Sequence, residues 1–182
     1  MLPVEAPMNT LMPGADFGSS RRTASRLSLL VDNPDILDGI FREAPTPIIT
    51  HCEDTPMIDA AVAAARARYG DAIPVAMHPD LRSREACLKS SELAVALARK
   101  HGTQLHVLHI STADELALFE AGPLIDAKGV RKRITAETCV HFLRFAREDY
   151  ATRGNFIKCN PAVKDASDRA ALLRALAEDR ID

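Results

Sequence analysis

From Asp32 onward, short β-type runs alternate with longer amphipathic helical runs. Residues 47–50 (Pro-Ile-Ile-Thr) and 104–110 (Gln-Leu-His-Val-Leu-His-Ile) each predict a strand that follows a helical segment. Such an alternation is typical of a parallel sheet with helices packed against it. The sequence therefore predicts an α/β fold.

Capping residues place the expected helices. Asn33 followed by Pro34 predicts a helix start, since asparagine caps the N-terminus and proline suits the first helical position. Ser111 is expected to cap a further helix in which Asp114 completes a capping box. The expected helices span residues 34–43, 55–69, 84–101, 112–121 and 166–178.

Four candidate strands, at 47–50, 104–110, 133–138 and 155–158, make about half of a (β/α)8 barrel, whose full form needs roughly 250 residues. We expect an atypical, flexible N-terminal segment over residues 1–30 and a partial barrel over residues 31–182. An open half barrel exposes sheet edges and apolar surface. Such a chain is either part of a longer protein or covers these edges by self-association.

Composition narrows the ligand class. Lys plus Arg total 23 against 25 Asp plus Glu, and the formal charge of −2 gives no indication of a nucleic-acid partner. No apolar run approaches the roughly 20 residues of a membrane-spanning helix, so no membrane is expected. Four unpaired cysteines predict neither a disulfide framework nor a cysteine zinc site, and they favour a cytoplasmic location. The expected ligand is a small molecule.

Polar side chains stand at or just beyond the ends of the predicted strands: His51, His109, Glu137, His141 and Asn160. In parallel α/β barrels, active sites are built at this rim. His106 and His109 are three residues apart and should point to opposite faces of their strand. We expect His109, which is nearer the rim, to face the barrel centre.

Two imidazoles from neighbouring strand ends suit a catalytic zinc ion, which takes neutral nitrogen ligands and keeps open positions for water. The alternative is a core role, because a lone histidine in an apolar strand is more often a satisfied core residue than a ligand. His78, which precedes Pro79, and His101, at a helix C-terminus, are weaker candidates.

Four linked stretches resemble bacterial dihydroorotases, and the resemblance covers roughly residues 30–182. They are Ile-Ile-Thr-His-Cys-Glu-Asp (48–54), His-Pro-Asp-Leu-Arg-Ser-Arg-Glu-Ala (78–86), Leu-His-Val-Leu-His-Ile-Ser-Thr (105–112) and Ile-Lys-Cys-Asn-Pro (157–161). Hydantoinases and allantoinases share the fold and several of these motifs. The resemblance therefore indicates a metal-dependent amidohydrolase barrel.

The resemblance also implies a site with two zinc ions, with His51 and His109 as ligands and Asn160 as a substrate contact. The implied reaction is the reversible hydrolysis of the cyclic amide of L-dihydroorotate to N-carbamoyl-L-aspartate, a step of pyrimidine biosynthesis. Glu137 and His141 match family residues that would at most contact the metal ligands, without binding the metal themselves. A second histidine, often found next in the family, is replaced by Phe142.

Three parts of the family's site have no match in this chain. There is no His-x-His pair, and the stretch 14–22 offers no lysine to bridge two metals. The aspartate that moves the proton is expected on a strand beyond Asp182, so no catalytic residue is assigned here and negligible turnover is expected. The alternatives are a non-catalytic truncated homologue acting as an interaction or scaffold module, and a hydantoinase-like or allantoinase-like cyclic amidase.

Overall fold

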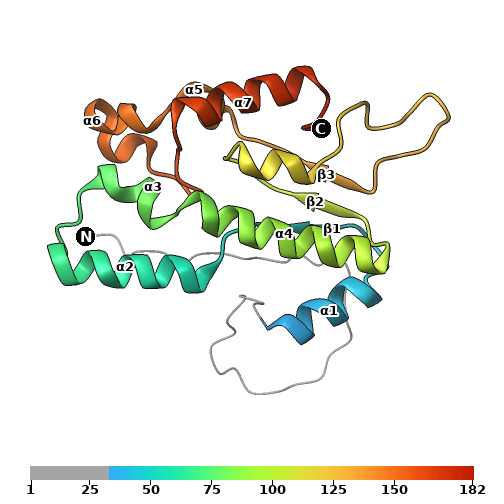
Figure 1. The fold of residues 1–182 in the computed structure, drawn as a ribbon, viewed down its shortest axis with the longest axis horizontal. Helices are drawn as coiled ribbons and strands as arrows, with labels where there is room; N and C mark the ends of the chain where they lie inside the picture. The colour runs from blue at the N-terminus through green and yellow to red at the C-terminus, as the bar shows by residue number, and fades with distance from the viewer. Residues whose placement is uncertain (1–32) are drawn as a thin grey trace.

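Three short parallel strands form the centre of the computed structural model, which describes residues 33–182. The strands β1 (Ile48–Thr50), β2 (Leu105–Val107) and β3 (Ile134–Ala136) lie in the order β1–β2–β3. Helices connect the strands and lie along the sheet (Figure 1). The predicted α/β class is confirmed, whereas the expected flexible segment over residues 1–30 and the lysine-free stretch 14–22 lie outside the described residues.

The sheet has one buried face and one open face. Leu105 and Val107 are 1% and 0% exposed and belong to the hydrophobic core. Side chains alternate along a strand, so the in-register row of Ile49, His106 and Thr135 faces the other way. Ile49 is 40% exposed. In a parallel barrel the helices lie outside, so this open face is the one that points to the barrel centre.

The four long helices begin and end close to the positions that the capping residues predict. The Asn33 side chain accepts hydrogen bonds from two backbone N–H groups in the first turn, and the Ser83 hydroxyl accepts one. Gly102, with φ of 68°, ends its helix in the left-handed conformation that favours glycine. These helices are α1 (Pro34–Glu43), α2 (Thr55–Tyr69), α4 (Arg84–His101) and α7 (Ala166–Ala177).

The prediction of a strand over residues 155–158 is wrong. This segment forms the 3-10 helix η4 (Gly154–Ile157), because Gly154 has φ of 53° and turns the chain where the strand should begin. Phe156, which a buried strand would cover, is 98% exposed. The three remaining predicted strands are present but shorter than expected.

The helix predicted over residues 112–121 is present only as the shorter 3-10 helix η2 (Asp114–Leu118). The capping exchange is shifted by one residue from Ser111 and Asp114 to Thr112 and Glu115. The Thr112 N–H and hydroxyl donate to Glu115 Oε2 at 3.2 and 2.8 Å, and the Glu115 N–H donates to Thr112 Oγ1 at 3.3 Å. Glu115 is buried, so this exchange fixes the turn that follows β2.

Short helices make the remaining connections. None of the helices of residues 33–182 is long and apolar enough to span a membrane. In Figure 1, α3 (His78–Leu81) and α6 (Tyr150–Arg153) lie at one end of the molecule, and the loop between η2 and β3 projects at the other. The short elements are η1 (Val75–Met77), α3 (His78–Leu81), α5 (Val140–Arg144), η3 (Arg147–Asp149) and α6 (Tyr150–Arg153).

The last residues of the chain lie along the outer edge of β3. The Asp182 N–H donates to the carbonyl oxygen of Ala136 at 2.9 Å, and Asp182 Oδ2 accepts from the Ala136 N–H at 3.4 Å. Ile181 is buried, and Lys132 Nζ lies 2.8 Å from Asp182 Oδ1. Asp182 therefore occupies the position that a neighbouring strand takes at this edge.

Candidate functional site

His51 and His109 face each other at the carboxyl ends of β1 and β2. Nδ1 of His51 lies 2.6 Å from Nε2 of His109, and the ring centroids are 4.7 Å apart. The strands end at Thr50 and Val107, which are paired in register, so neighbouring parallel strands deliver both rings to one edge of the sheet. This is the edge at which barrel enzymes build their sites.

The expectation that His106 points away from the barrel centre is wrong. His106 lies on the open face of the sheet, where its Nδ1 is 2.8 Å from Thr135 Oγ1 and its Nε2 is 3.3 Å from Glu137 Oε2. Strand alternation does not reach His109, because β2 ends at Val107 and His109 has φ of 49°. The positive φ turns the chain at His109, so the alternation of side chains along a strand does not place the two histidines on opposite faces.

Burial keeps the facing imidazoles neutral. Burial is the main cause that lowers the pKa of His109 to about 4, and the nearby His51 contributes to the same shift. Burial also lowers the pKa of His51, although the negative charge of Glu137 opposes this shift. Near pH 7, one ring nitrogen of the pair therefore donates a hydrogen and the other accepts it.

Two neutral imidazoles on adjacent strand ends are ligands of the type that zinc prefers. A tetrahedral zinc ion with bonds of about 2.0–2.1 Å separates two nitrogen ligands by about 3.3 Å, so the rings would have to move apart by roughly 0.7 Å. Residues 33–182 contain no group of three or more His, Cys, Asp or Glu side chains that could hold a metal. The described part of the chain thus fits a portion of a zinc site.

Glu137 and His141 flank the histidine pair. The Glu137 carboxylate contacts His106 and acts on His51 only through its charge. His141 packs its ring against Phe142 with a centroid separation of 4.2 Å, and it affects His109 electrostatically. The structure thus places both side chains beside the pair, without a hydrogen bond to either ring among the described residues.

Asn160 is exposed, and the carbonyl of the residue before it accepts a hydrogen bond from His78. The His78 Nε2–H donates to the Cys159 carbonyl oxygen at 2.8 Å. His78 begins α3 and is 6% exposed, and burial lowers its pKa to about 4, so the ring is neutral. Sequence reasoning treated His78 as a weaker candidate and missed this role, because the partner carbonyl is 81 residues away.

A buried ion pair lies close behind His51 in the sequence. Arg82 Nη1 lies 2.5 Å from Glu53 Oε2, and both side chains are 8% exposed. Burial raises the pKa of Glu53, while the positive charges of Arg82 and the buried Lys164 lower it. The pair links the turn after β1 to the segment before α4. The local pattern around Glu53 gives no signal that would have identified its partner.

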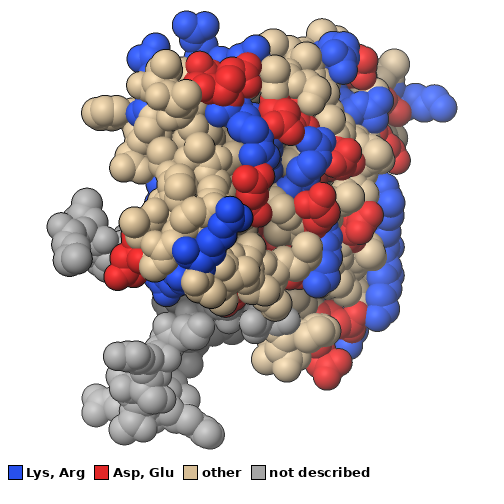
Figure 2. All heavy atoms as spheres, turned by 60° about the vertical axis from the view of Figure 1, so that its left-hand side comes forward, with Lys and Arg blue, Asp and Glu red and all other residues tan. Residues whose placement is uncertain are grey.

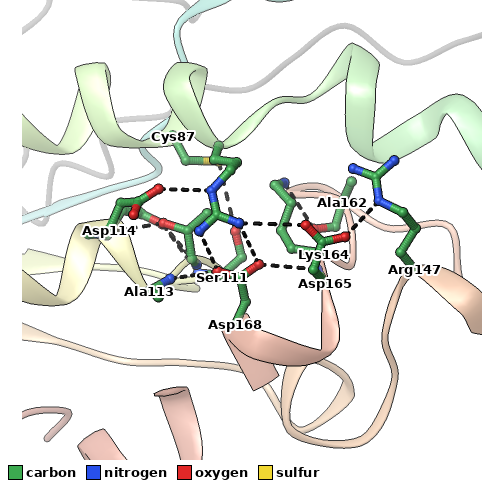
Figure 3. A network of polar contacts seen from close by, with 12 residues as sticks. Cys87, Ser111, Ala113, Asp114, Arg147, Ala162, Lys164, Asp165 and Asp168 are labelled. Carbon is green, nitrogen blue, oxygen red and sulfur yellow. Dashed lines mark hydrogen bonds and ion pairs between the residues drawn. The ribbon is translucent and has the colours of Figure 1, made fainter. Parts of the chain in front are cut away.

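A second network fixes the turn after His109 (Figure 3). Arg84 donates to Asp114 at 2.8 Å and to both carboxylate oxygens of Asp168 at 2.9 and 2.8 Å. Asp168 also accepts the Ala113 N–H at 2.8 Å. Arg84 lies in the first turn of α4 and Asp168 in that of α7, so the network joins both helix starts to the loop after β2.

Comparison with known proteins gives relatives of one enzymatic class, although no family model matches the chain. The chain is 32% identical over 135 residues to an allantoinase from Streptomyces avermitilis, covering 74% of this chain and 28% of that protein. It is 31% identical over 144 residues to a dihydroorotase from Staphylococcus aureus, covering 74% and 30%. The chain therefore spans less than a third of the length of these curated relatives.

Solved structures with the same fold include an L-hydantoinase (dihydropyrimidinase) from Arthrobacter aurescens, with a TM-score of 0.73 and 21% identity over 88% of this chain and 35% of that one. A dihydropyrimidinase from Brevibacillus agri gives a TM-score of 0.71 and 21% identity over 87% and 34%. These likenesses confirm a partial (β/α)8 barrel of the amidohydrolase type. With its sequence relatives, the chain belongs to the cyclic amidohydrolase superfamily.

Proposed function

We propose that this chain forms part of the active site of a zinc-dependent dihydroorotase of pyrimidine biosynthesis in the cytoplasm. The reaction would be the reversible hydrolysis of L-dihydroorotate to N-carbamoyl-L-aspartate. The observation that carries the proposal is the pair of neutral imidazoles, His51 and His109, at the ends of neighbouring strands. The four sequence stretches that resemble dihydroorotases support this substrate.

His51 and His109 would hold the metal, and burial of both rings keeps their nitrogen lone pairs available at neutral pH. Bound zinc polarises a carbonyl and lowers the pKa of water to about 7. The Asn160 side chain would orient the cyclic amide, since its own amide offers a donor and an acceptor together. The His78 hydrogen bond to the preceding carbonyl would keep the Asn160 backbone in place.

A small ligand also agrees with the charge distribution. Figure 2 turns one side of Figure 1 forward, and Lys and Arg side chains are interspersed there with Asp and Glu. A face of mixed sign offers no extended site for a polyanion such as a nucleic acid.

The test measures the zinc-dependent binding of three cyclic amides. The purified chain is titrated with L-dihydroorotate, hydantoin and allantoin, and binding is monitored by nuclear magnetic resonance. We expect the tightest binding for L-dihydroorotate. Asn160→Ala should weaken binding of the ring and leave the zinc content unchanged, whereas His51→Ala should lower both. Tighter binding of allantoin or hydantoin would contradict the dihydroorotase assignment.

Turnover by the chain alone should be negligible, because its sequence contains no His-x-His pair and no residue assigned as the general acid or base. Proton transfer by a positioned side chain typically contributes 10²- to 10⁴-fold to the rate. Measurable opening of dihydroorotate by the pure chain would show that a catalytic group is present that we have not identified.

A second candidate is an allantoinase-like cyclic amidase, which the 32% identity to the allantoinase favours. A third is a non-catalytic scaffold, which the presence of only two facing ligands among residues 33–182 favours. Binding of allantoin in the titration would support the former. Absence of both zinc and cyclic-amide binding would support the latter.

A further inference from the structure

A cavity of about 490 Å³ opens at the end of the sheet opposite the histidine pair. Gly102 and Thr103, which precede β2, and Arg133 and Ile134, at the start of β3, line it together with the projecting loop that ends at Lys132. We propose that this cavity binds a small phosphate-bearing ligand with at least two negative charges. This inference does not depend on the proposed function.

The projecting loop that forms one wall of the cavity is held by its own hydrogen bonds. Its two arms pair in an antiparallel bridge between Ile125 and Arg131. The Asp126 carboxylate accepts the N–H groups of Lys128 and Val130, both at 2.8 Å, and so fixes the tip. Gly122 at the base donates its N–H to the Glu178 carbonyl oxygen at 3.1 Å. The cavity is therefore bounded by hydrogen-bonded backbone on its outer side.

Several basic side chains near the cavity already have acidic partners. Lys100 Nζ and His101 Nε2 lie 2.5 and 2.9 Å from Asp38 Oδ1. Lys132, which lines the cavity, pairs with Asp182 at 2.8 Å. These side chains already pair with the protein's own carboxylates, so a ligand in the cavity would have to be bound by the remaining basic residues.

Three arginines that line the cavity have no ion pair within residues 33–182. Arg99 Nη2 donates to the Leu118 carbonyl oxygen at 3.1 Å, and Arg133 Nη1 donates to the Gly102 carbonyl oxygen at 2.7 Å. Each bond uses one nitrogen of the guanidinium group and leaves others free. Arg131 joins the hairpin through its backbone. These three arginines outnumber the two acidic residues that line the cavity, Glu120 and Asp126. The Asp126 carboxylate is already engaged by the N–H groups of the loop tip.

Guanidinium groups suit phosphate, because their planar forks donate two parallel hydrogen bonds to its oxygens. Because Glu120 and Asp126 line the cavity beside the arginines, a singly charged anion would gain little there. Apolar atoms of Ala98, Leu118 and Ile134 offer contact to an organic group. The volume falls within the range of about 300–1,000 Å³ for small-molecule sites. A diphosphate or a phosphate ester fits this combination of charge and apolar wall.

The test is isothermal titration of the purified chain with inorganic pyrophosphate at constant ionic strength. We expect one saturable site per chain. Arg131→Ala should weaken binding about tenfold, because it removes a charge-assisted hydrogen bond while the backbone bridge remains. Glu120→Gln should strengthen binding, because it removes a repelling carboxylate. Arg153→Ala, at the end of α6, is the matched arginine control and should bind as the unmodified chain does.

Two results would overturn the proposal. One is the absence of saturable pyrophosphate binding by the unmodified chain. The other is an equal loss of affinity in Arg131→Ala and Arg153→Ala, which would indicate nonspecific attraction to the overall charge. Circular dichroism of each variant shows whether its fold is retained, and Glu120→Gln adds a variant whose expected change has the opposite sign.

Discussion

The Nδ1 atom of His51 lies 2.6 Å from the Nε2 atom of His109, although 58 residues separate them in the sequence. Parallel pairing of β1 with β2 produces this contact, since both strands end at the same edge. The contact brings two neutral ring nitrogens together and gives the chain the beginning of a metal site.

Removal of either histidine of this pair should weaken zinc binding by more than about tenfold, because the loss of supporting groups alone typically costs 10- to 100-fold in metal affinity. The measurement is zinc titration monitored by calorimetry for His51→Ala and His109→Ala. His101→Ala, which alters a partly buried pair with Asp38, is the histidine control. Equal zinc binding by the double variant His51→Ala/His109→Ala would contradict the ligand assignment.

His78 should make the protein less stable in mild acid. Burial is the main cause that lowers its pKa from the ordinary 6.5 to about 4 in the folded protein. The unfolded chain binds the proton first, so this contribution is complete above pH 6.5 and is lost as the pH falls toward 4. The loss is on the order of 3 kcal/mol in the free energy of unfolding.

The measurement is urea unfolding of the unmodified chain and of His78→Gln between pH 8 and pH 4. Glutamine keeps an N–H donor for the Cys159 carbonyl and cannot be protonated in this range. We expect a smaller loss of stability in the variant between pH 6.5 and pH 4, and parallel curves above pH 7. Identical curves over the whole range would contradict the prediction.

Asp168→Ala should lower the free energy of unfolding by about 3–5 kcal/mol, as expected when one member of a buried charged pair is removed. The carboxylate is 2% exposed and accepts hydrogen bonds from Arg84 and from the Ala113 N–H. Asp80→Ala is the control, because Asp80 is 55% exposed and pairs with Arg147 at the surface. Its cost should be about 0–1 kcal/mol. Equal costs in urea unfolding would show that the network does not fix the two helix starts.

Two adjacent leucines of α7 offer a test of the core. Leu172 is 0% exposed, and Leu172→Ala should cost about 2–5 kcal/mol in unfolding free energy through lost burial and a cavity. Leu173 is 50% exposed, and Leu173→Ala should cost less than about 1 kcal/mol. Thermal and urea unfolding of both variants give the comparison. A larger cost at Leu173 would mean that α7 packs with its other face inward.

Local patterns in the sequence determined the elements whose causes are local. Asn33, Ser83 and Gly102 fix helix ends through bonds within a few residues, and the structure has those ends where the pattern predicts them. Alternation of strand and helix segments likewise predicted the parallel sheet, because each short apolar strand needs covering helices. The sequence also predicted that chemically active residues, including His51 and His109, follow the ends of the strands.

Tertiary structure alone decided the relations between distant segments. At Gly154 a positive φ turns the chain, and a 3-10 helix forms where a strand was predicted. At His109 a positive φ ends the strand alternation that predicted opposite faces for His106 and His109. The contact of His78 with the Cys159 carbonyl and that of Arg82 with Glu53 join segments that share no sequence pattern. Such contacts follow from packing, which brings buried polar groups to whichever partner the fold places beside them, and a local pattern does not encode that partner.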